Sequence, residues 1–446
     1  MVTKPEILEA MQFSFLQDKD PLNTSGDSRY TITYQYAGTS APIDLPSDTV
    51  FSGWTDFTAA EKTAFEAALA HIESFLNVDF VEMSGSANPD LNVGQVTLPG
   101  TTTGTGGPSI SYSGTTISRF DAFVVYDNTL DLSTDAQMSL MLHELGHALG
   151  LKHPFSTPTL PVSEENHKYT LMSYTDNPDN GQRSDAMMLY DVYALQDFWG
   201  SAAYNTGDTS YTGSRTDTVD TVWDSAGTDH FDASALSTGV DLDLRQGAFS
   251  SFGSYPDVVI AYGTKIENAT GGAGADILTG NKLANVLTGK GGNDTITAGS
   301  GADTLKGGNG KDVLKGQKGK DILAGDKGAD ELYGQNQNDT LKGGGGNDEL
   351  FGGNGKDTLK GQNGNDKLTG GGGSDRFVFA KNGDKDTIKD FTNNVDEIKF
   401  IGLGTESQIM AKASETGSDV VFDFGNGDML TVLNTTLGQI SDDILT

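Results

Sequence analysis

Three of the six histidines of this chain lie between residues 143 and 153, in the stretch HELGHALGLKH. On a helix, His143 and His147 stand four residues apart and share one face, so both imidazoles can reach the same ion. Gly150 would let the chain turn away and return His153 as a third nitrogen ligand. Three protein ligands leave one position open for water, which is typical of a catalytic zinc ion rather than a closed structural one.

Glu144 follows the first histidine and lies beside the predicted metal without being needed as a ligand. Zinc lowers the pKa of a bound water toward about 7 and polarises a substrate carbonyl. Glu144 can then take the proton of that water and pass it to a leaving amine as general base and acid. The alternative is a helix with incidental histidines. HExxH alone leaves that alternative open, and the longer HExxHxxGxxH favours the single catalytic Zn²⁺.

Two strands and a loop are predicted around this stretch. Residues Arg29 to Tyr36, RYTITYQY, alternate and are rich in β-branched and aromatic residues, which predicts a strand. Asp121 to Tyr126, DAFVVY, is a second predicted strand. Thr101 to Gly107, TTTGTGG, is predicted to be a loop.

Two helices are predicted in the same region of the chain. Thr58 and Glu61 form a capping-box pattern ahead of apolar residues at helical spacing, in TAAEKTAFEAALAHIESFLN. The second helix begins near Ser133 or Asp135, carries the first two histidines and ends at Gly150, a residue type that tolerates a left-handed turn.

Two other histidines are candidates for metal ligands by residue type alone. His71, in the first predicted helix, is interpreted as a packed or solvated residue rather than a ligand. His167 is interpreted as an exposed loop residue, with contact to a substrate as the alternative.

The bulk composition excludes several classes of protein. A formal charge of -33 argues against nucleic acid as a partner, because a phosphate backbone needs clustered Lys and Arg. The absence of cysteine removes disulfides, thiolate ligands and a thiol nucleophile. The sequence contains no run of about 18 apolar residues, so no membrane span is predicted. Met1 to Asp20 lacks the apolar core of a Sec signal peptide.

From Gly271 to Val378 a nine-residue unit repeats twelve times without insertion. The eighth position is Leu, Ile or Phe throughout, and the sixth is Asn285 in the second unit. A flexible glycine linker is the alternative, but a linker has no reason to place an apolar residue every ninth position. The other units carry aspartate at the sixth position: Asp276, Asp294, Asp303, Asp312, Asp321, Asp330, Asp339, Asp348, Asp357, Asp366 and Asp375.

Glycines in such a unit let the backbone turn with positive φ and bring carbonyl oxygens toward a point where the aspartate completes an oxygen cage for Ca²⁺. Stacked turns would form a parallel β-roll with a file of leucines inside and several calcium ions along its edges. One buried leucine per unit does not offset the entropy of ordering nine residues, so this region is predicted to fold only when calcium binds. Two units, Gly280 to Thr288 and Gly334 to Lys342, depart from the pattern and are expected to have weaker or absent ion sites.

The repeat resembles the RTX (repeats-in-toxin) family. That resemblance implies two units per turn and export from Gram-negative bacteria by type I secretion machinery, guided by an uncleaved C-terminal signal. The tail Ser441 to Thr446, SDDILT, is similar to that signal.

The motif HELGHALGLKH resembles the metzincin zinc endopeptidases, and Tyr169 to Tyr174, YTLMSY, is similar to their Met-turn. The resemblance implies that Met172 packs beneath the zinc without binding it. It also implies that Tyr174 is catalytic, approaching or binding the metal and stabilising the oxyanion.

Pro154 after the third histidine, the serine and tyrosine after Met172, and the attached RTX region together resemble the serralysins. The segment from His153 to Met172 is short for that family, and Thr101 to Gly107 does not align with it, which implies a reshaped substrate cleft. The family has a short N-terminal propeptide, and whether the residues before Ser25 include one stays open. Four further segments resemble the end of the catalytic domain, the entry into the roll and the sheet that follows it: Asp191 to Gly200, Asp220 to Asp232, Ile260 to Ala269 and Asp386 to Ile398.

The expected fold is α+β. A metzincin zinc-protease domain, a twisted sheet with helices, spans residues 1–205, and an all-β parallel β-roll with a C-terminal β-sandwich-like cap spans residues 206–446. The implied function is a secreted, extracellular, calcium-dependent zinc endopeptidase, with protein or peptide substrates, the type I secretion machinery and a proteinaceous inhibitor as partners, acting as a monomer. The alternative is a catalytically inactive RTX surface or adhesion protein, and an intact Glu144 weighs against it.

Overall fold

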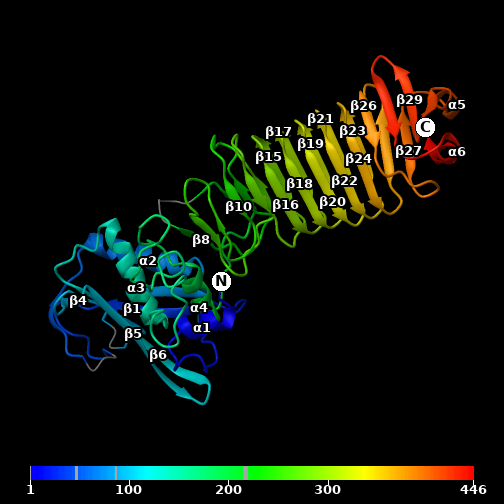
Figure 1. Cartoon of the computed structure of the whole chain (residues 1–446). Coiled ribbons are helices and arrows are strands. Elements are labelled where there is room, and N and C mark those ends of the chain that lie inside the picture. The colour runs from blue at the N-terminus through cyan, green and yellow to red at the C-terminus, as the bar shows by residue number, and fades with distance from the viewer. Residues whose placement is uncertain (1, 46–48, 86–87, 214–218) are drawn as a thin grey trace. The chain divides into compact units, whose positions relative to one another are not determined.

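The computed structural model describes residues 2–45, 49–85, 88–213 and 219–446 (Figure 1). By its internal contacts the chain divides into two compact units. Unit 1 comprises Met1–Gly207, Ser214–Gly227 and Tyr255–Thr264, and unit 2 comprises Asp208–Gly213, Thr228–Ser254 and Lys265–Thr446.

Unit 1 contains a mixed sheet with the strand order β3-β1-β4-β6-β5, in which β2 pairs with β4. The first four strands of that order run parallel to one another, and β5 is an antiparallel edge strand. Both predicted strands are confirmed, as β1 and as part of β6. The bounds are β1 (Tyr30–Tyr36), β2 (Ser52–Thr55), β3 (Val78–Glu82), β4 (Leu91–Thr97), β5 (Gly104–Ser113) and β6 (Thr116–Asp127).

The prediction that Thr101 to Gly107 is a loop is wrong for its second half, because β5 begins at Gly104. Gly104 pairs with Tyr126 and Gly107 with Phe123 in the antiparallel ladder with β6. A glycine-rich run has a low intrinsic propensity to form a strand, and pairing with β6 outweighs that propensity here.

The helices of unit 1 follow the predicted pattern. Thr58 caps the first predicted helix and its hydroxyl accepts the N–H of Glu61, while the Glu61 carboxylate accepts the N–H of Thr58. The second predicted helix starts as a 3-10 turn at Asp135 and stops at Gly150, whose φ is +119°. The bounds are α1 (Lys4–Met11), α2 (Ala59–Glu73), η1 (Asp135–Gln137), α3 (Met138–Leu149) and α4 (Leu189–Trp199).

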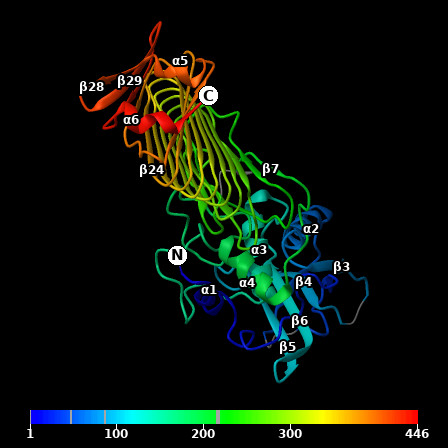
Figure 2. The ribbon, with the colours of Figure 1, turned by 90° about the vertical axis from the view of Figure 1, so that its right-hand side faces the viewer.

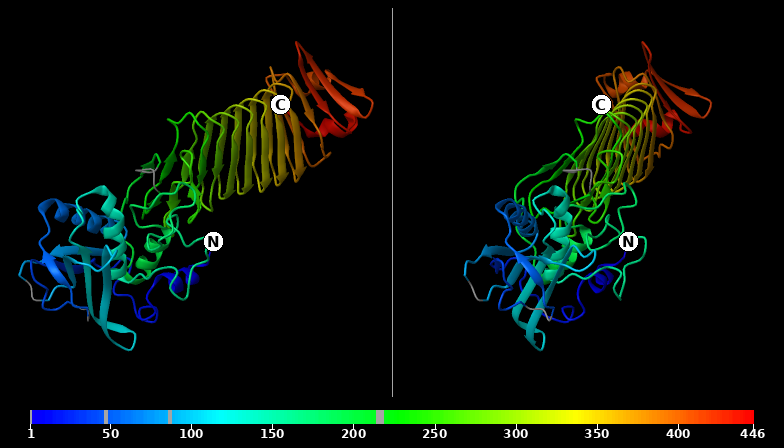
Figure 3. Two further views of the ribbon diagram at one scale, coloured as in Figure 1. Left: turned by 60° about the vertical axis from the view of Figure 1, so that its left-hand side comes forward. Right: turned by 90° about the vertical axis from the view of Figure 1, so that its left-hand side faces the viewer.

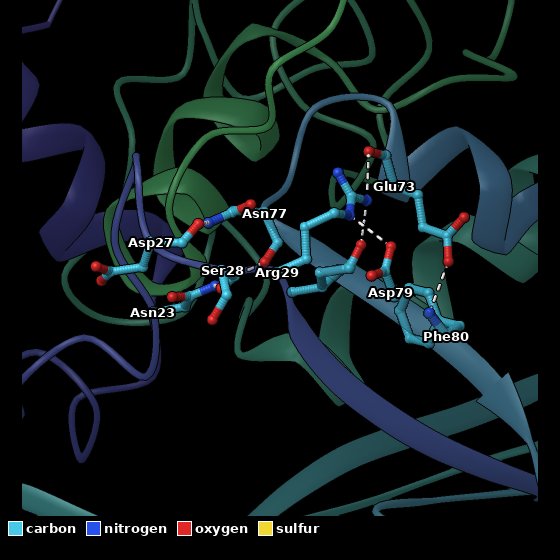
Figure 4. A network of polar contacts seen from close by, with 9 residues as sticks. Asn23, Asp27, Ser28, Arg29, Glu73, Asn77, Asp79 and Phe80 are labelled. Atoms are coloured by element: carbon cyan, nitrogen blue, oxygen red, sulfur yellow. Dashed lines mark hydrogen bonds and ion pairs between the residues drawn. The ribbon is translucent and has the colours of Figure 1, made fainter.

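Arg29 joins the start of β1 to the end of α2 and to β3 (Figure 4). Its guanidinium donates to the carboxylate of Asp79 at 2.5 Å, to the carbonyl of Glu73 at 3.1 Å and to the carbonyl of Val78. The Glu73 carboxylate in turn accepts the N–H of Phe80 at 2.6 Å. These bonds fix the edge of the sheet that lies farthest in strand order from β5.

Unit 1 also contains the parallel pair β8 (Asp220–Val222) and β12 (Val258–Ile260). Among the residues that the structure describes, no helix is both long and apolar enough to cross a membrane.

Unit 2 is built from two long sheets whose strands alternate along the chain, and the predicted parallel β-roll is confirmed (Figures 1 and 2). One sheet has the order β10-β14-β16-β18-β20-β22-β24-β26-β30-β29-β28, and the other β31-β27-β25-β23-β21-β19-β17-β15-β13-β9-β7. The repeat strands are β14 (Ile277–Thr279), β15 (Val286–Gly291), β16 (Thr295–Ser300), β17 (Thr304–Asn309), β18 (Val313–Lys318), β19 (Ile322–Lys327), β20 (Glu331–Asn336), β21 (Thr340–Gly345), β22 (Glu349–Asn354), β23 (Thr358–Asn363), β24 (Lys367–Gly372) and β25 (Arg376–Ala380).

Each repeat strand pairs with the strand two units later, so two nonapeptides make one turn. Ile296 pairs with Leu314 and Leu305 with Leu323, a register of eighteen residues. The eighth-position side chains are all buried between the two sheets, where they form the file predicted from the period. The stacked turns can be followed in both views of Figure 3.

Both sheets continue past the repeats at each end. Before them, β7 (Ser210–Tyr211), β9 (His230–Asp232) and β13 (Asn268–Thr270) extend one sheet and β10 (Asp241–Asp243) extends the other, while β11 (Phe249–Ser250) belongs to neither. After them, β28, β29 and β30 are antiparallel, and Phe379, Phe400 and Phe422 pack between the layers. The remaining bounds are β26 (Lys385–Ile388), β27 (Glu397–Ile401), α5 (Glu406–Met410), β28 (Ala413–Thr416), β29 (Asp419–Gly425), β30 (Asp428–Val432), α6 (Leu437–Ile440), η2 (Ser441–Asp443) and β31 (Ile444–Leu445).

Candidate metal centre and active site

The three predicted histidine ligands meet in unit 1. His143 and His147 lie on α3, and the chain turns at Gly150 and brings His153 back to them. Nε2 of His153 lies 3.2 Å from Nε2 of His143 and 3.1 Å from Nε2 of His147. In the part of the chain that the structure describes, this is the one group of three or more potential metal-ligating side chains whose ligand atoms lie within 4.8 Å of one another.

The other ring nitrogens of two of these histidines face backbone carbonyls. Nδ1 of His143 lies 3.0 Å from the oxygen of Leu171, and Nδ1 of His147 lies 2.8 Å from the oxygen of Leu151. A carbonyl only accepts, so each Nδ1 carries the proton and each Nε2 offers a lone pair. The lone pairs therefore converge on one point without a proton between them, which fits a bound cation.

Burial keeps these imidazoles neutral. Together with the two neighbouring histidines, it lowers the pKa of His147 to about 3. Burial also lowers the pKa of His153 to about 4, and it lowers the pKa of His143. Neutral imidazole is the form that binds a metal, and three nitrogen donors suit Zn²⁺.

Glu144 lies beside the triad in a low-dielectric environment. Its side chain is 6% exposed, and burial raises the pKa of its carboxyl to about 8. Together with His143 and Tyr174 it lines a cavity of about 920 Å³. A carboxyl group that gains a proton readily at neutral pH is suited to general acid and base work.

Two glycines of β5 allow the edge strand to lie directly against Glu144. A Cβ at Gly104 would come within 2.8 Å of Cγ and 2.9 Å of Oε1 of Glu144. A Cβ at Gly106 would come within 2.4 Å of the Glu144 carbonyl oxygen. The sequence interpretation missed this role, although the glycine run that did not align was a signal that something approaches closely there.

Met172 lies under α3. It is fully buried, and its Sδ would be 2.8 Å from a Cβ at Gly146, which lies between the two helical histidines. The turn that carries Met172 is held by Asp191, in the first turn of α4. The fully buried Asp191 carboxylate accepts the N–H of Leu171 at 2.7 Å and the hydroxyl of Thr170 at 2.6 Å.

Asp191 is a positioning residue that the sequence interpretation did not single out. It fixes the turn whose Leu171 carbonyl faces Nδ1 of His143, so it is connected to the candidate metal centre through Leu171. Burial raises the pKa of Asp191 to about 6 against three hydrogen bonds that lower it.

Tyr174 reaches the triad from the same turn. Its hydroxyl lies 2.8 Å from Nε2 of His153, and its ring stacks on that of His143 at a centroid distance of 5.7 Å. The ring is 60% exposed, so the hydroxyl is accessible from the cavity that it lines.

The interpretation of His167 as an exposed loop residue is wrong. His167 is 4% exposed and lines the same cavity as Glu144, and its Nδ1 accepts the N–H of Ser184 at 3.1 Å. The local sequence has no signal for this burial, because the covering residue lies 17 positions later. His71 is a packed helix residue, whose Nε2 accepts the N–H of Met187 at 3.1 Å.

The aspartates of the repeat form two rows in unit 2, one along each edge of the roll. Oδ1 of each except Asp276 accepts the N–H of the sixth-position residue one turn earlier, as in Asp312 with Asp294 at 2.8 Å and Asp321 with Asp303 at 2.9 Å. Ten of these carboxylates, within the described residues, are buried with Oδ2 lacking any hydrogen-bond partner: Asp294, Asp303, Asp312, Asp321, Asp330, Asp339, Asp348, Asp357, Asp366 and Asp375.

Nine of these ten orphaned oxygens lie close to the first-position glycine of their own unit, and the unit of Asp303 has Ala298 there instead. A Cβ at Gly289 would come within 2.1 Å of Oδ2 of Asp294 and 2.7 Å of the carbonyl oxygen of Gly307 in the next turn. Burial, together with the charges of the aspartates one turn away, raises the pKa of Asp294 to about 7. A buried carboxylate facing a carbonyl oxygen fits Ca²⁺, which takes oxygen ligands.

Two sixth-position residues at the start of the rows differ. Oδ1 and Oδ2 of Asp276 accept the N–H groups of Val240 and Gly272, at 2.9 and 2.7 Å. Asn285 is hydrogen-bonded through both side-chain atoms. In the other irregular unit, Gln337 adopts φ +76° in place of glycine, and Oδ2 of Asp339 has no partner.

A comparison with known protein families identifies the C-terminal part of the chain. The family model described as Peptidase M10 serralysin C terminal matches residues 199–445, more than half of the chain. The chain belongs to the serralysin-type metalloprotease family. The sequence resemblance to serralysins is thereby confirmed.

Individual serralysin relatives are similar over part of their length. Metallopeptidase AprA of Pseudomonas marginalis is 29% identical over 298 residues, 57% of this chain and 60% of that protein. Serralysin G of Dickeya chrysanthemi is 30% identical over 279 residues, 55% of this chain and 58% of that protein. The chain thus spans about 60% of the length of these curated relatives. Among solved structures, the extracellular lipase LipA of Serratia marcescens overlaps 41% of this chain and 40% of that chain at 20% identity, with a TM-score of 0.19.

Proposed function

We propose that this serralysin-type chain is a secreted, calcium-dependent zinc endopeptidase that hydrolyses peptide bonds of extracellular proteins, with unit 1 as a metzincin-type catalytic domain. The observation that carries the proposal is the convergence of three histidine Nε2 atoms beside the buried carboxyl of Glu144. The cavity lined by Glu144, His143 and Tyr174 would receive the substrate.

His143, His147 and His153 would hold the zinc ion through Nε2, since the Nδ1 atoms of the first two are engaged by backbone carbonyls. A bound zinc ion would supply a lowered pKa for a coordinated water and polarisation of the scissile carbonyl. Met172 packs beneath α3 and keeps the histidine-bearing turn in place without contributing a ligand.

Glu144 would accept the proton of the attacking water and deliver it to the leaving amine. Its burial favours the first step, because the carboxylate lacks solvent to stabilise its charge and readily takes up a proton. The Tyr174 hydroxyl would donate a hydrogen bond to the carbonyl oxygen as negative charge develops there. Its position 2.8 Å from the His153 nitrogen places that donor at the triad.

The ten aspartates with orphaned Oδ2 atoms would hold several structural calcium ions along the two edges of the roll. Each ion would also draw on carbonyl oxygens of the first-position glycines. The role of Asp276 as a calcium ligand remains a prediction from the sequence, because both of its carboxylate oxygens already accept backbone N–H groups.

The same proposal covers location and partners. Protein or peptide substrates, export by type I secretion machinery and regulation by a proteinaceous inhibitor are proposed on the strength of membership in the serralysin family. We propose that the chain acts as a monomer.

Cleavage of casein tests the proposal. With zinc and calcium present, we expect Glu144→Gln to retain one zinc per chain and to cleave on the order of 10³-fold more slowly than the parent, because it keeps the side-chain volume and loses the base. Glu66→Gln, at an exposed position on α2, is the matched control and should cleave like the parent.

A zinc chelator should abolish cleavage, and added zinc should restore it. Undiminished cleavage by Glu144→Gln would refute the mechanism. A parent chain that binds zinc but cleaves nothing would favour the alternative of an inactive RTX surface or adhesion protein.

A further inference from the structure

The first repeat turn on one edge of the roll differs from those that follow it. Its sixth position carries Asn285 in place of aspartate, and its second position carries Asn281. The turn also lacks the left-handed residues at its second and fourth positions that later turns on this edge have, such as Gly299 and Gly301. The backbone of this turn therefore differs from that of the later turns on the same edge.

The two side-chain amides fill this turn with hydrogen-bond donors. Nδ2 of Asn281 donates to the carbonyl oxygens of Leu244 at 3.0 Å and Ile266 at 2.8 Å. Nδ2 of Asn285 donates to the carbonyl of Glu267 at 2.8 Å and to Oδ1 of Asn281 at 3.2 Å. All three carbonyls belong to the segments that precede this turn, so the amides join the repeats to the start of unit 2.

The side-chain oxygens of the pair are also satisfied. Oδ1 of Asn285 accepts the N–H of Asn281 at 2.8 Å, and Oδ1 of Asn281 accepts the N–H of Leu283 at 2.8 Å. Asn285 is 1% exposed, and every amide hydrogen of the two side chains has an acceptor. The pair thus forms a buried, neutral and fully bonded network, which needs no counter-ion.

The following turn on the same edge shows the contrast. Oδ2 of Asp303 is buried without a partner. The side-chain oxygen of Asn285, Oδ1, lies next to Gly280 and already accepts an N–H. A cation is held by oxygens that face a common point. Around this turn the carbonyl oxygens of Leu244, Ile266 and Glu267 accept amide N–H groups, which serve these oxygens in place of a cation.

We propose that the amides of Asn281 and Asn285 replace a cation at this turn, so that the calcium row on this edge begins at Asp303. The inference rests on the proposed calcium rows and refines them. The amide turn joins two sheets at the N-terminal end of the repeats with bonds that do not depend on calcium. It gives the roll a preformed end onto which the calcium-bound turns stack.

Calcium counting on the full chain tests this proposal. After equilibrium dialysis against calcium, bound ions are counted by plasma mass spectrometry in the parent, in Asn285→Ala and in Asp321→Asn. We expect Asn285→Ala to bind as many ions as the parent, and to unfold at a temperature lower by about 5 °C because three side-chain hydrogen bonds are lost. Asp321→Asn should bind fewer ions. Asn336→Ala, an exposed asparagine of the same roll, is the control and should change neither quantity.

The outcomes separate the two proposals. A lower ion count in Asn285→Ala than in the parent would overturn the amide turn and leave the calcium rows intact. A parent that binds no calcium, or an Asp321→Asn that binds as many ions as the parent, would contradict the calcium rows and this inference with them. If Asn285→Ala does not fold, Asn281→Ala at a half-buried position carries the same test, with the same ion count expected.

Discussion

The hydroxyl of Tyr174 lies 2.8 Å from Nε2 of His153, a residue 21 positions earlier in the chain. If that hydroxyl stabilises developing charge, Tyr174→Phe keeps the ring and removes the donor. We expect kcat for casein or a peptide substrate to fall by about 10²-fold with KM nearly unchanged, because the hydrogen bond strengthens only in the transition state.

Zinc content distinguishes this role from a structural one. Tyr174→Phe should still bind one zinc per chain, and Tyr204→Phe, at an exposed position of the same unit, should keep parental kcat. An unchanged kcat in Tyr174→Phe would show that the hydroxyl takes no part in the reaction.

The close approach of β5 to Glu144 leads to a second prediction. Gly104→Ala would place a Cβ within 2.8 Å of Cγ and 2.9 Å of Oε1 of Glu144 and push the carboxyl away from the triad. We expect kcat to fall on the order of 10- to 100-fold with zinc binding retained, since small misplacements of a catalytic group are costly.

Gly107→Ala is the matched control for that substitution. It lies on the same strand, and its added Cβ would meet only a ring atom of Phe123, at 3.8 Å. Equal effects of the two substitutions on kcat would point to damage to the strand rather than to displacement of Glu144.

Removal of calcium should unfold the roll. Ten buried carboxylate oxygens without partners destabilise the calcium-free fold, whereas calcium bound to the folded chain stabilises it. Circular dichroism of the full chain in chelator should show a large loss of β-structure that millimolar calcium reverses. A spectrum that does not change on chelation would contradict the proposed dependence.

The stability of the calcium-free roll should also depend on pH. Burial, aided by neighbouring aspartates, raises the pKa of Asp294, Asp339 and Asp348 to about 7, compared with about 3.9 for an unfolded aspartate. The folded chain therefore holds protons that the unfolded chain has lost, and its stability falls as pH rises from about 4 to about 7.

Circular dichroism of the full chain in chelator at pH 5 and pH 7.5 measures this effect, with more β-structure expected at pH 5. Asp339→Asn removes one of these ionisations and should reduce the difference between the two pH values. More β-structure at pH 7.5 than at pH 5 in chelator would show that the carboxylates are not destabilised by burial.

The histidine triad was predictable because its geometry is local. Helical spacing places His143 and His147 on one face, and Gly150, with φ +119°, ends the helix so that His153 can return. The nonapeptide period likewise predicted the parallel roll and the buried leucine file, since each turn repeats the same local conformation.

The features that were missed depend on contacts between distant segments. The glycine run around Gly104 signals a close approach, but the sequence does not indicate that Glu144 makes it, because that contact exists only after β5 joins the sheet. His167 looked like a loop residue, and only its bond to Ser184 places it inside the cavity. Asp191 was visible as part of a helix, but its bonds to the turn at Leu171 come from tertiary structure.

The eighteen-residue register restricts how the length of the roll can change. Each aspartate accepts the N–H of the residue one full turn earlier, and each strand pairs with the strand two units away. Deletion of a single nonapeptide would move every later strand to the opposite sheet and join β26 and β27 to the wrong partners. Deletion or duplication of two adjacent nonapeptides would preserve every pairing, so the roll can gain or lose length only in whole turns.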